Sequence, residues 1–180
     1  MRDRERMVIA GPFADSRISS TNEWLTPRNI VDALGPFDLD PCAPPLERRP
    51  WGTALMHYDE RHDGLTQEWH GLVWCNPPYG KHTGEWLRRC ADHGSAIALV
   101  FARTDAAWFH EHVATRADAL LFWRRRICFC LSVTGEASKT PAAPSMFIAY
   151  GAAAADRLRR FESKGALVHL RRSGDSECAA

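Results

Sequence analysis

The sequence has no run of apolar residues long enough to cross a membrane, for which a helix needs about 20. Its first ten residues carry three arginines and two acidic residues with no long apolar stretch behind them. A secretory signal peptide requires such a stretch, so secretion is not expected. The sequence therefore predicts a cytoplasmic protein without a membrane partner.

The sequence also lacks a cysteine pattern typical of metal sites and a strong charge of either sign. None of its six cysteines belongs to a Cys-x-x-Cys pair, so we expect reduced thiols and no metal. The formal net charge is +1, whereas dedicated phosphate-binding proteins carry a marked basic excess. Any contact with nucleic acid must therefore come from a local group of basic residues.

The length and composition fit one folded domain. The chain has 180 residues, of which 45% are hydrophobic, enough for a sizeable core. The first 20 residues mix charge with Gly, Pro and Ser and show no periodicity, which predicts a flexible arm over 1–20. A similar composition after Arg172 predicts a flexible tail over 173–180, and leaves a single domain over 21–172.

Apolar runs alternate with amphipathic segments along this domain. We expect strands over 37–40, 71–75, 96–102, 119–131 and 145–150, and helices over 82–93 and 105–114. The last two strands flank a polar loop over 132–144 and suit an antiparallel hairpin. Alternating strands and helices indicate an α/β sheet, whose ligands bind at the carboxyl ends of the strands. Asp40, Asn76 and Arg103 are expected at those ends.

The most informative motif is Asn76-Pro77-Pro78-Tyr79, placed between an expected strand and an expected helix. Two consecutive prolines remove two backbone donors and fix φ, so the carbonyl groups of this corner point in set directions. The Asn76 side-chain oxygen and the Pro77 carbonyl oxygen can then accept the two hydrogens of a planar amino group during its alkylation. Tyr79 offers a flat surface on which a base can stack.

Other interpretations of the corner remain open at this point. Asn-Pro and Pro-Pro dipeptides are common in turns without any catalytic role. The same acceptors would also suit an amino group of cytosine, of guanine in RNA, or of a protein glutamine. A non-catalytic DNA-binding relative that kept the fold is a further alternative.

Six short blocks in one order extend the motif to a family resemblance. They are EWLTP at 23–27, DLDPCA at 38–43, DGL at 63–65, CNPPYG at 75–80, ARTD at 102–105 and PSM at 144–146. Together the blocks run from about residue 22 to residue 150, which is most of the chain. The sequence thus resembles the small phage-type (Dam-like) DNA adenine-N6 methyltransferases.

The resemblance implies a fold, a cofactor and a substrate. The fold would be a compact Rossmann-like class I methyltransferase sheet, mostly parallel, with an antiparallel hairpin near the C-terminus. The cofactor would be S-adenosylmethionine, and the substrate an adenine flipped out of double-stranded DNA. No Gly-x-Gly follows Asp40, so we expect a shortened cofactor half. Host-restriction evasion by a phage is the family's expected role, and the protein is expected to be a monomer or a homodimer.

The resemblance also assigns cofactor contacts. Asp40 follows the first expected strand and can accept a hydrogen bond from the ammonium group of the cofactor's methionine part. Taken alone, Asp40 is equally well read as a solvated turn residue, and Asp63 as a hairpin turn residue. The full set of expected cofactor contacts is Thr26, Pro27, Asp40, Pro41, Asp63 and Asn76.

DNA contacts are expected from basic residues outside the corner. Arg124 and Arg126 belong to the most concentrated positive charge in the sequence. On a strand with alternating sides, both would face the same way and reach phosphates together. The alternative is a solvated cluster that protects an edge strand from aggregation. Arg103 and Lys139 complete the set of expected DNA-binding residues.

Overall fold

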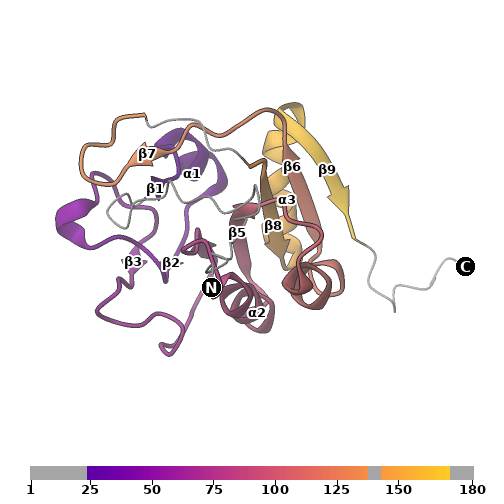
Figure 1. Ribbon diagram of the computed structural model, residues 1–180, viewed down its shortest axis with the longest axis horizontal. Helices are drawn as coiled ribbons and strands as arrows, with labels where there is room; N and C mark the ends of the chain where they lie inside the picture. The colour runs from indigo at the N-terminus through magenta and orange to yellow at the C-terminus, as the bar shows by residue number, and fades with distance from the viewer. Residues whose placement is uncertain (1–23, 138–142, 171–180) are drawn as a thin grey trace, which may run out of the picture.

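The computed structural model describes residues 24–137 and 143–170 as a mixed α/β fold (Figure 1). A seven-stranded sheet has the order β3-β2-β4-β5-β8-β6-β9, and a separate two-stranded sheet joins β1 to β7. The strands are β1 Trp24–Leu25, β2 Leu39–Asp40, β3 Met56–His57, β4 Val73–Cys75, β5 Ala96–Phe101, β6 Ala119–Trp123, β7 Cys130–Leu131, β8 Ser145–Tyr150 and β9 Gly165–His169. The helices are α1 Arg28–Leu34, η1 Leu46–Arg48, α2 Thr83–His93, η2 Phe109–Ala114, α3 Ala152–Leu158 and η3 Arg159–Lys164.

Five of the seven strands of the large sheet point in the same direction. The pairs β3–β2, β2–β4 and β4–β5 are parallel. Both β5 and β6 pair antiparallel with β8, so β6 runs in the same direction as β5. The sheet is therefore mixed, with three parallel and three antiparallel pairings, and the predicted late antiparallel pair is present as β6 and β8. The carboxyl ends of β2, β4, β5 and β6 consequently meet at one edge.

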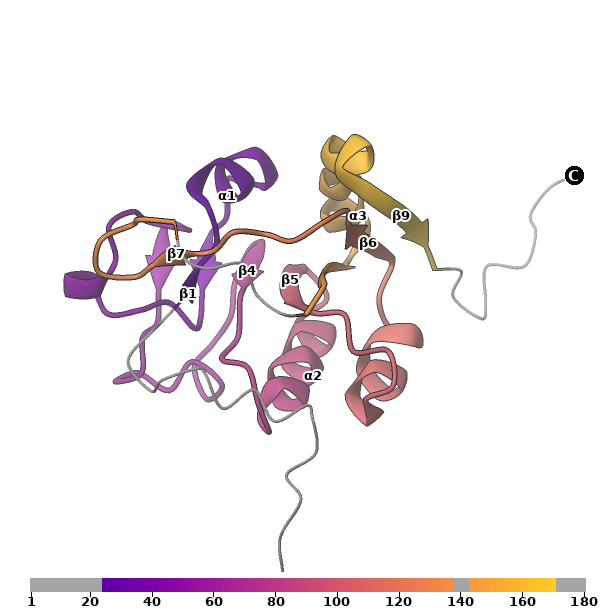
Figure 2. The same cartoon turned by 45° about the horizontal axis from the view of Figure 1, so that its top comes forward.

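Helices cover both faces of the sheet and bury its central strands. The apolar sides of α1 and α3 pack on one face together with residues such as Ile97 and Phe147. On the other face, α2 and η2 pack against Ala98 and Ile148. Figure 2 shows α1 and α3 on one side of the strands and α2 on the other. This cover on both faces explains why β5 and β8 are almost continuously apolar.

The predicted strand over 119–131 is wrong beyond Trp123. There β6 makes its last pairing, with Gly165 of β9, so no neighbouring strand is left for the following residues. The chain then turns at Arg125, whose φ is +70°, and continues to β7, which pairs with β1. Arg124 and Arg126 therefore do not lie on a strand with alternating sides. The apolar pattern that suggested a strand instead buries Ile127 and Phe129 in the core.

Other expected boundaries are only partly matched. Helix α2 ends before Gly94, whose φ of +73° terminates it as the sequence predicts. The helix expected over 105–114 begins later, and its described π-helical part is η2. The strands expected over 37–40, 71–75 and 96–102 are shorter, because pairing begins or ends within them.

Lys139, the arm over 1–20 and the tail over 173–180 lie outside the described residues. No helix within the described part of the chain is long and apolar enough to span a membrane.

Replacing Gly64 by alanine tests a tight contact that positions the loop after β3. A Cβ at Gly64 would lie 1.9 Å from the carbonyl oxygen of Pro41, so the backbone must move. We expect Gly64→Ala to lower the free energy of unfolding by about 1–3 kcal/mol, the usual range for overpacking. Chemical denaturation should detect this as a lower midpoint. Gly52→Ala is the matched control, because its Cβ would come no closer than 3.5 Å to any neighbour, and an equal loss there would contradict the steric explanation.

Candidate functional site

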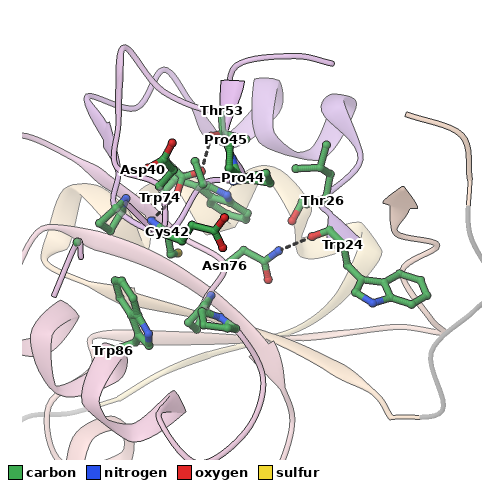
Figure 3. Close-up of a pocket in the computed structure, with 18 of the residues that line it drawn as sticks. Trp24, Thr26, Asp40, Cys42, Pro44, Pro45, Thr53, Trp74, Asn76 and Trp86 are labelled. Carbon is green, nitrogen blue, oxygen red and sulfur yellow. Dashed lines mark hydrogen bonds between the residues drawn. The ribbon is translucent and has the colours of Figure 1, made fainter. Parts of the chain in front are cut away.

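A cavity of about 480 Å³ opens at the carboxyl ends of β2 and β4 (Figure 3). Eight of the nine residues expected for catalysis and cofactor binding line it: Thr26, Asp40, Pro41, Asp63, Asn76, Pro77, Pro78 and Tyr79. The structure therefore brings together residues that are spread over most of the first half of the chain. Pro27 is the exception among the expected cofactor contacts, because it is the residue before α1 and does not line this cavity.

The Asn76 side chain is held in one orientation. Its amide nitrogen Nδ2 donates a hydrogen bond of 3.1 Å to the backbone carbonyl of Trp24 in β1 (Figure 3). The amide oxygen Oδ1 must then act as the acceptor, since the two ends of the amide differ in hydrogen-bonding role. The Tyr79 hydroxyl lies 3.4 Å from Oδ1 as a long donor. One acceptor oxygen is thus presented at the cavity by an amide that cannot freely rotate.

The Tyr79 ring is supported from behind. It stacks on Phe101, the last residue of β5, with ring centroids 4.1 Å apart and an angle of 8° between the planes. Tyr79 lines the cavity and Phe101 does not. The tyrosine ring therefore lies between the end of β5 and the cavity. Burial raises the pKa of the Tyr79 hydroxyl well above its ordinary value, so the group remains protonated at physiological pH.

Asp40 is a buried carboxylate with polar partners on both oxygens. Its Oδ1 accepts a 3.1 Å hydrogen bond from the backbone N–H of Cys42, and its Oδ2 accepts one from the Thr53 hydroxyl. Burial raises the pKa of Asp40 to about 6, while these two hydrogen bonds and the charge of Arg49 act in the opposite direction. The carboxyl group therefore changes its charge close to neutral pH.

Thr53 is held in place by His57 of β3. The ring nitrogen Nε2 of His57 accepts hydrogen bonds from the backbone N–H groups of Thr53, at 3.1 Å, and of Ala54, at 3.2 Å. A nitrogen that accepts carries no proton, which requires neutral imidazole. Burial, and secondarily the charge of Arg49, lowers the pKa of His57 to about 4. The sequence contains no local motif for this arrangement, which depends on the pairing of His57 with Asp40 between β3 and β2.

Three further carboxylates line the same cavity. Asp59 accepts a 3.0 Å hydrogen bond from the backbone N–H of Arg61, and Glu60 forms an ion pair with Arg48 at 2.9 Å. Asp63 lies in a turn with a φ of +51°. With Asp40 these make four acidic residues, whereas no lysine or arginine of the described chain lines the cavity. The cavity therefore favours a positively charged ligand.

The cavity wall also contains an unsatisfied hydroxyl. The Thr26 side chain is buried, with 1% of its surface exposed, and its Oγ1 has no hydrogen-bond partner. The indole nitrogen of Trp24, two residues earlier, is buried without a partner as well. Buried polar atoms are normally paired, so a ligand with polar groups would satisfy them.

The expected DNA-binding residues lie outside the cavity. Arg103 is exposed two residues after β5, and Arg124 and Arg126 are exposed beyond the end of β6. Cys42 lines the cavity, and its sulfur lies 3.8 Å from the sulfur of buried Cys75. Within the described residues no group of three His, Cys, Asp or Glu side chains is arranged to hold a metal.

Comparison with known proteins gives one match. No curated protein and no solved structure matches the chain. The model of the family described as DNA N-6-adenine-methyltransferase (Dam) matches residues 15–171 and so includes both the cavity and the whole large sheet. A match of this length shows that the chain belongs to the DNA N-6-adenine-methyltransferase (Dam) family.

Proposed function

We propose that this protein transfers a methyl group from S-adenosylmethionine to the exocyclic amino group of adenine in double-stranded DNA. The observation that carries the proposal is the Asn76 amide, whose oxygen is fixed as an acceptor at the mouth of an acidic cavity. Membership of the Dam family supports DNA as the substrate and adenine as the base. The order of the strands supports a Rossmann-like methyltransferase sheet with a shortened cofactor half.

The residues of the cavity fit S-adenosylmethionine. When bound, the cofactor supplies a methyl group activated by its positively charged sulfonium. The four carboxylates of the wall suit both that charge and an ammonium group, and the volume lies in the range of small-molecule sites. Asp40 would accept from the ammonium group, and Thr26 Oγ1 would form the hydrogen bond that it lacks. Pro41 and Asp63 would contact the nucleoside part.

The corner at residues 76–79 would hold the flipped adenine. The Asn76 Oδ1 and the Pro77 carbonyl oxygen would accept the two hydrogens of the amino group. These fixed acceptors favour the state in which the nitrogen acquires positive charge, because they need no reorganisation as that charge develops. Tyr79 would stack on the base, with Phe101 supporting it from the other side. Flipping is required because the target nitrogen cannot reach such a cavity from within the duplex.

Product analysis tests the reaction itself. The protein is incubated with S-adenosylmethionine carrying a labelled methyl group and with an unmethylated duplex of mixed sequence, which is then digested to nucleosides. We expect label in N6-methyladenine. Label in N4-methylcytosine instead would show that cytosine, and not adenine, is the base that receives the methyl group. DNA binding without any label would instead identify a non-catalytic relative.

Substitutions of Asn76 test the role of its oxygen. Asn76→Ala removes the acceptor, and we expect kcat to fall by about a hundredfold or more, as when one preorganised polar group is lost elsewhere. Asn76→Asp keeps an acceptor but loses the hydrogen bond to the Trp24 carbonyl, so its kcat should lie between those of the wild type and Asn76→Ala. Single-turnover kinetics and cofactor titration should separate methyl transfer from binding. A loss of cofactor affinity equal to the loss of kcat would contradict the assignment.

The pH dependence of cofactor binding tests Asp40. Its carboxyl group is protonated below a pKa of about 6 and ionised above it, so affinity for the cationic cofactor should rise as pH increases from 5 to 7. We expect Asp40→Asn to weaken binding about tenfold at pH 7.5 and to remove this rise. Calorimetric titration over this pH range measures both effects.

Thr53 provides the matched pair of variants for this measurement. The Thr53 hydroxyl lowers the pKa of Asp40 by donating to the carboxylate. Thr53→Val should therefore move the midpoint of the pH profile upward, and Thr53→Ser should leave it near the wild-type position. Identical profiles for the valine and serine variants would show that the hydroxyl does not act on Asp40.

A further inference from the structure

A second, smaller hollow of about 250 Å³ lies between the start of α1 and the end of β6. Two basic residues, Arg126 and Lys164, line it together with the amide of Asn29. The remaining wall is aromatic and aliphatic, and consists of Pro27, Ile30, Trp123, Ile127, Cys128 and Phe161. No carboxylate among the described residues lines the hollow, which is the opposite of the acidic cavity.

Contacts between neighbouring elements fix the shape of this hollow. The N–H of Arg124 donates a 2.9 Å hydrogen bond to the carbonyl of Lys164, which brings the ends of β6 and η3 together. Arg157 donates to the carbonyl groups of Leu34 and Pro36, and so attaches the end of α1 to α3. The Trp123 and Phe161 rings meet edge to face at 5.3 Å and form one wall. The hollow is therefore built from three connected elements.

The charges of Arg126 and Lys164 are available to a ligand. Neither side chain forms an ion pair with a carboxylate within residues 24–137 and 143–170, and both are exposed. By contrast, Arg157 and Arg160 are engaged with carbonyl oxygens of residues 33–36. Two unpaired cations beside an amide donor favour an anion with several oxygens, such as a phosphodiester.

The hollow is adjacent to the acidic cavity. Thr26 lines the cavity, and the next residue, Pro27, lines the hollow, so the two sites share one short stretch of backbone. Both lie at the edge where β4 and β6 have their carboxyl ends. The cavity does not suit the phosphates of a DNA strand that places a base in it, because its wall carries acidic residues and no lysine or arginine of the described chain.

We propose that this hollow binds a backbone phosphate of the DNA strand next to the flipped nucleotide, with Arg126 and Lys164 holding the same phosphate. The proposal rests on DNA being the substrate of the neighbouring cavity. Asn29 adds a neutral donor, and the Trp123–Phe161 wall contacts the adjoining deoxyribose. The two sites thus separate two ligands by charge. The positively charged cofactor binds in the acidic cavity, and the DNA phosphate binds in the basic hollow.

Salt dependence of DNA binding tests the shared phosphate. The variants Arg126→Ala, Lys164→Ala and the double variant are titrated with a fluorescent mixed-sequence duplex at 50–200 mM salt. The slope of log Kobs against log salt counts neutralised phosphates, at about 0.9 for each. If both cations hold one phosphate, either cation alone still neutralises it, so each single variant should bind DNA more weakly with nearly the wild-type slope. Only the double variant should reduce the slope by about one. Between these salt concentrations the wild type should then lose roughly fourfold more affinity than the double variant.

Arg125→Ala is the matched control, because Arg125 is exposed beside Arg126 but does not line the hollow. We expect its affinity and its slope to equal those of the wild type. A slope reduced by about one in each single variant and by about two in the double variant would overturn the proposal. An unchanged slope in the double variant, or a loss of affinity in Arg125→Ala equal to that in Arg126→Ala, would also overturn it.

The labelled-methyl assay distinguishes this proposal from the proposed function. Adenine methylation with an unchanged salt slope in the double variant would overturn the phosphate site and leave the proposed methyltransferase activity standing. A reduced slope in the double variant without any methyl transfer would leave the phosphate site standing and overturn the proposed activity. Competition by an acidic peptide that equals that of duplex DNA at the same charge concentration would also count against a phosphate site.

Discussion

The hydrogen bond from the Asn76 amide to the Trp24 carbonyl connects the two sheets of the protein at the candidate site. Asn76 follows β4 of the large sheet, and Trp24 belongs to β1 of the small one. The small sheet in turn carries Thr26 into the cavity wall and leads into α1, which forms part of the basic hollow. The positions of the acceptor oxygen, the cavity and the hollow therefore all depend on where β1 lies, although their residues come from distant parts of the chain.

The sequence predicted those parts of the site that are encoded locally. Asn76 follows a short apolar strand and Asp40 is the last residue of another, and parallel pairing brings such positions to one edge. Thr53 and His57 could not be predicted in the same way, because their contact with Asp40 depends on how β3 pairs with β2. The arginines after β6 were misplaced for a related reason. An apolar pattern indicates burial, but only a neighbouring strand makes a segment part of a sheet, and β6 loses both neighbours near Trp123.

A formal net charge of +1 conceals a strong separation of charge over a short distance. The four acidic residues of the large cavity and the two cations of the small hollow partly offset one another in the total, while each group creates its own local potential. The net charge alone therefore gives no indication of DNA binding. The folded arrangement gives a different result, because a nucleic acid senses the field near its phosphates and not the sum over the chain.

The stacking of Tyr79 on Phe101 has a consequence for how the protein could change its preferred base. Phe101 is the last residue of a central strand and pairs with Ser145, so the plane of the tyrosine ring is tied to the paired strands β5 and β8. Because the Tyr79 ring is already ordered, stacking a base on it costs little conformational entropy. The platform accepts any flat ring, so evolution or design can leave it untouched and alter selectivity by changing the loops around it.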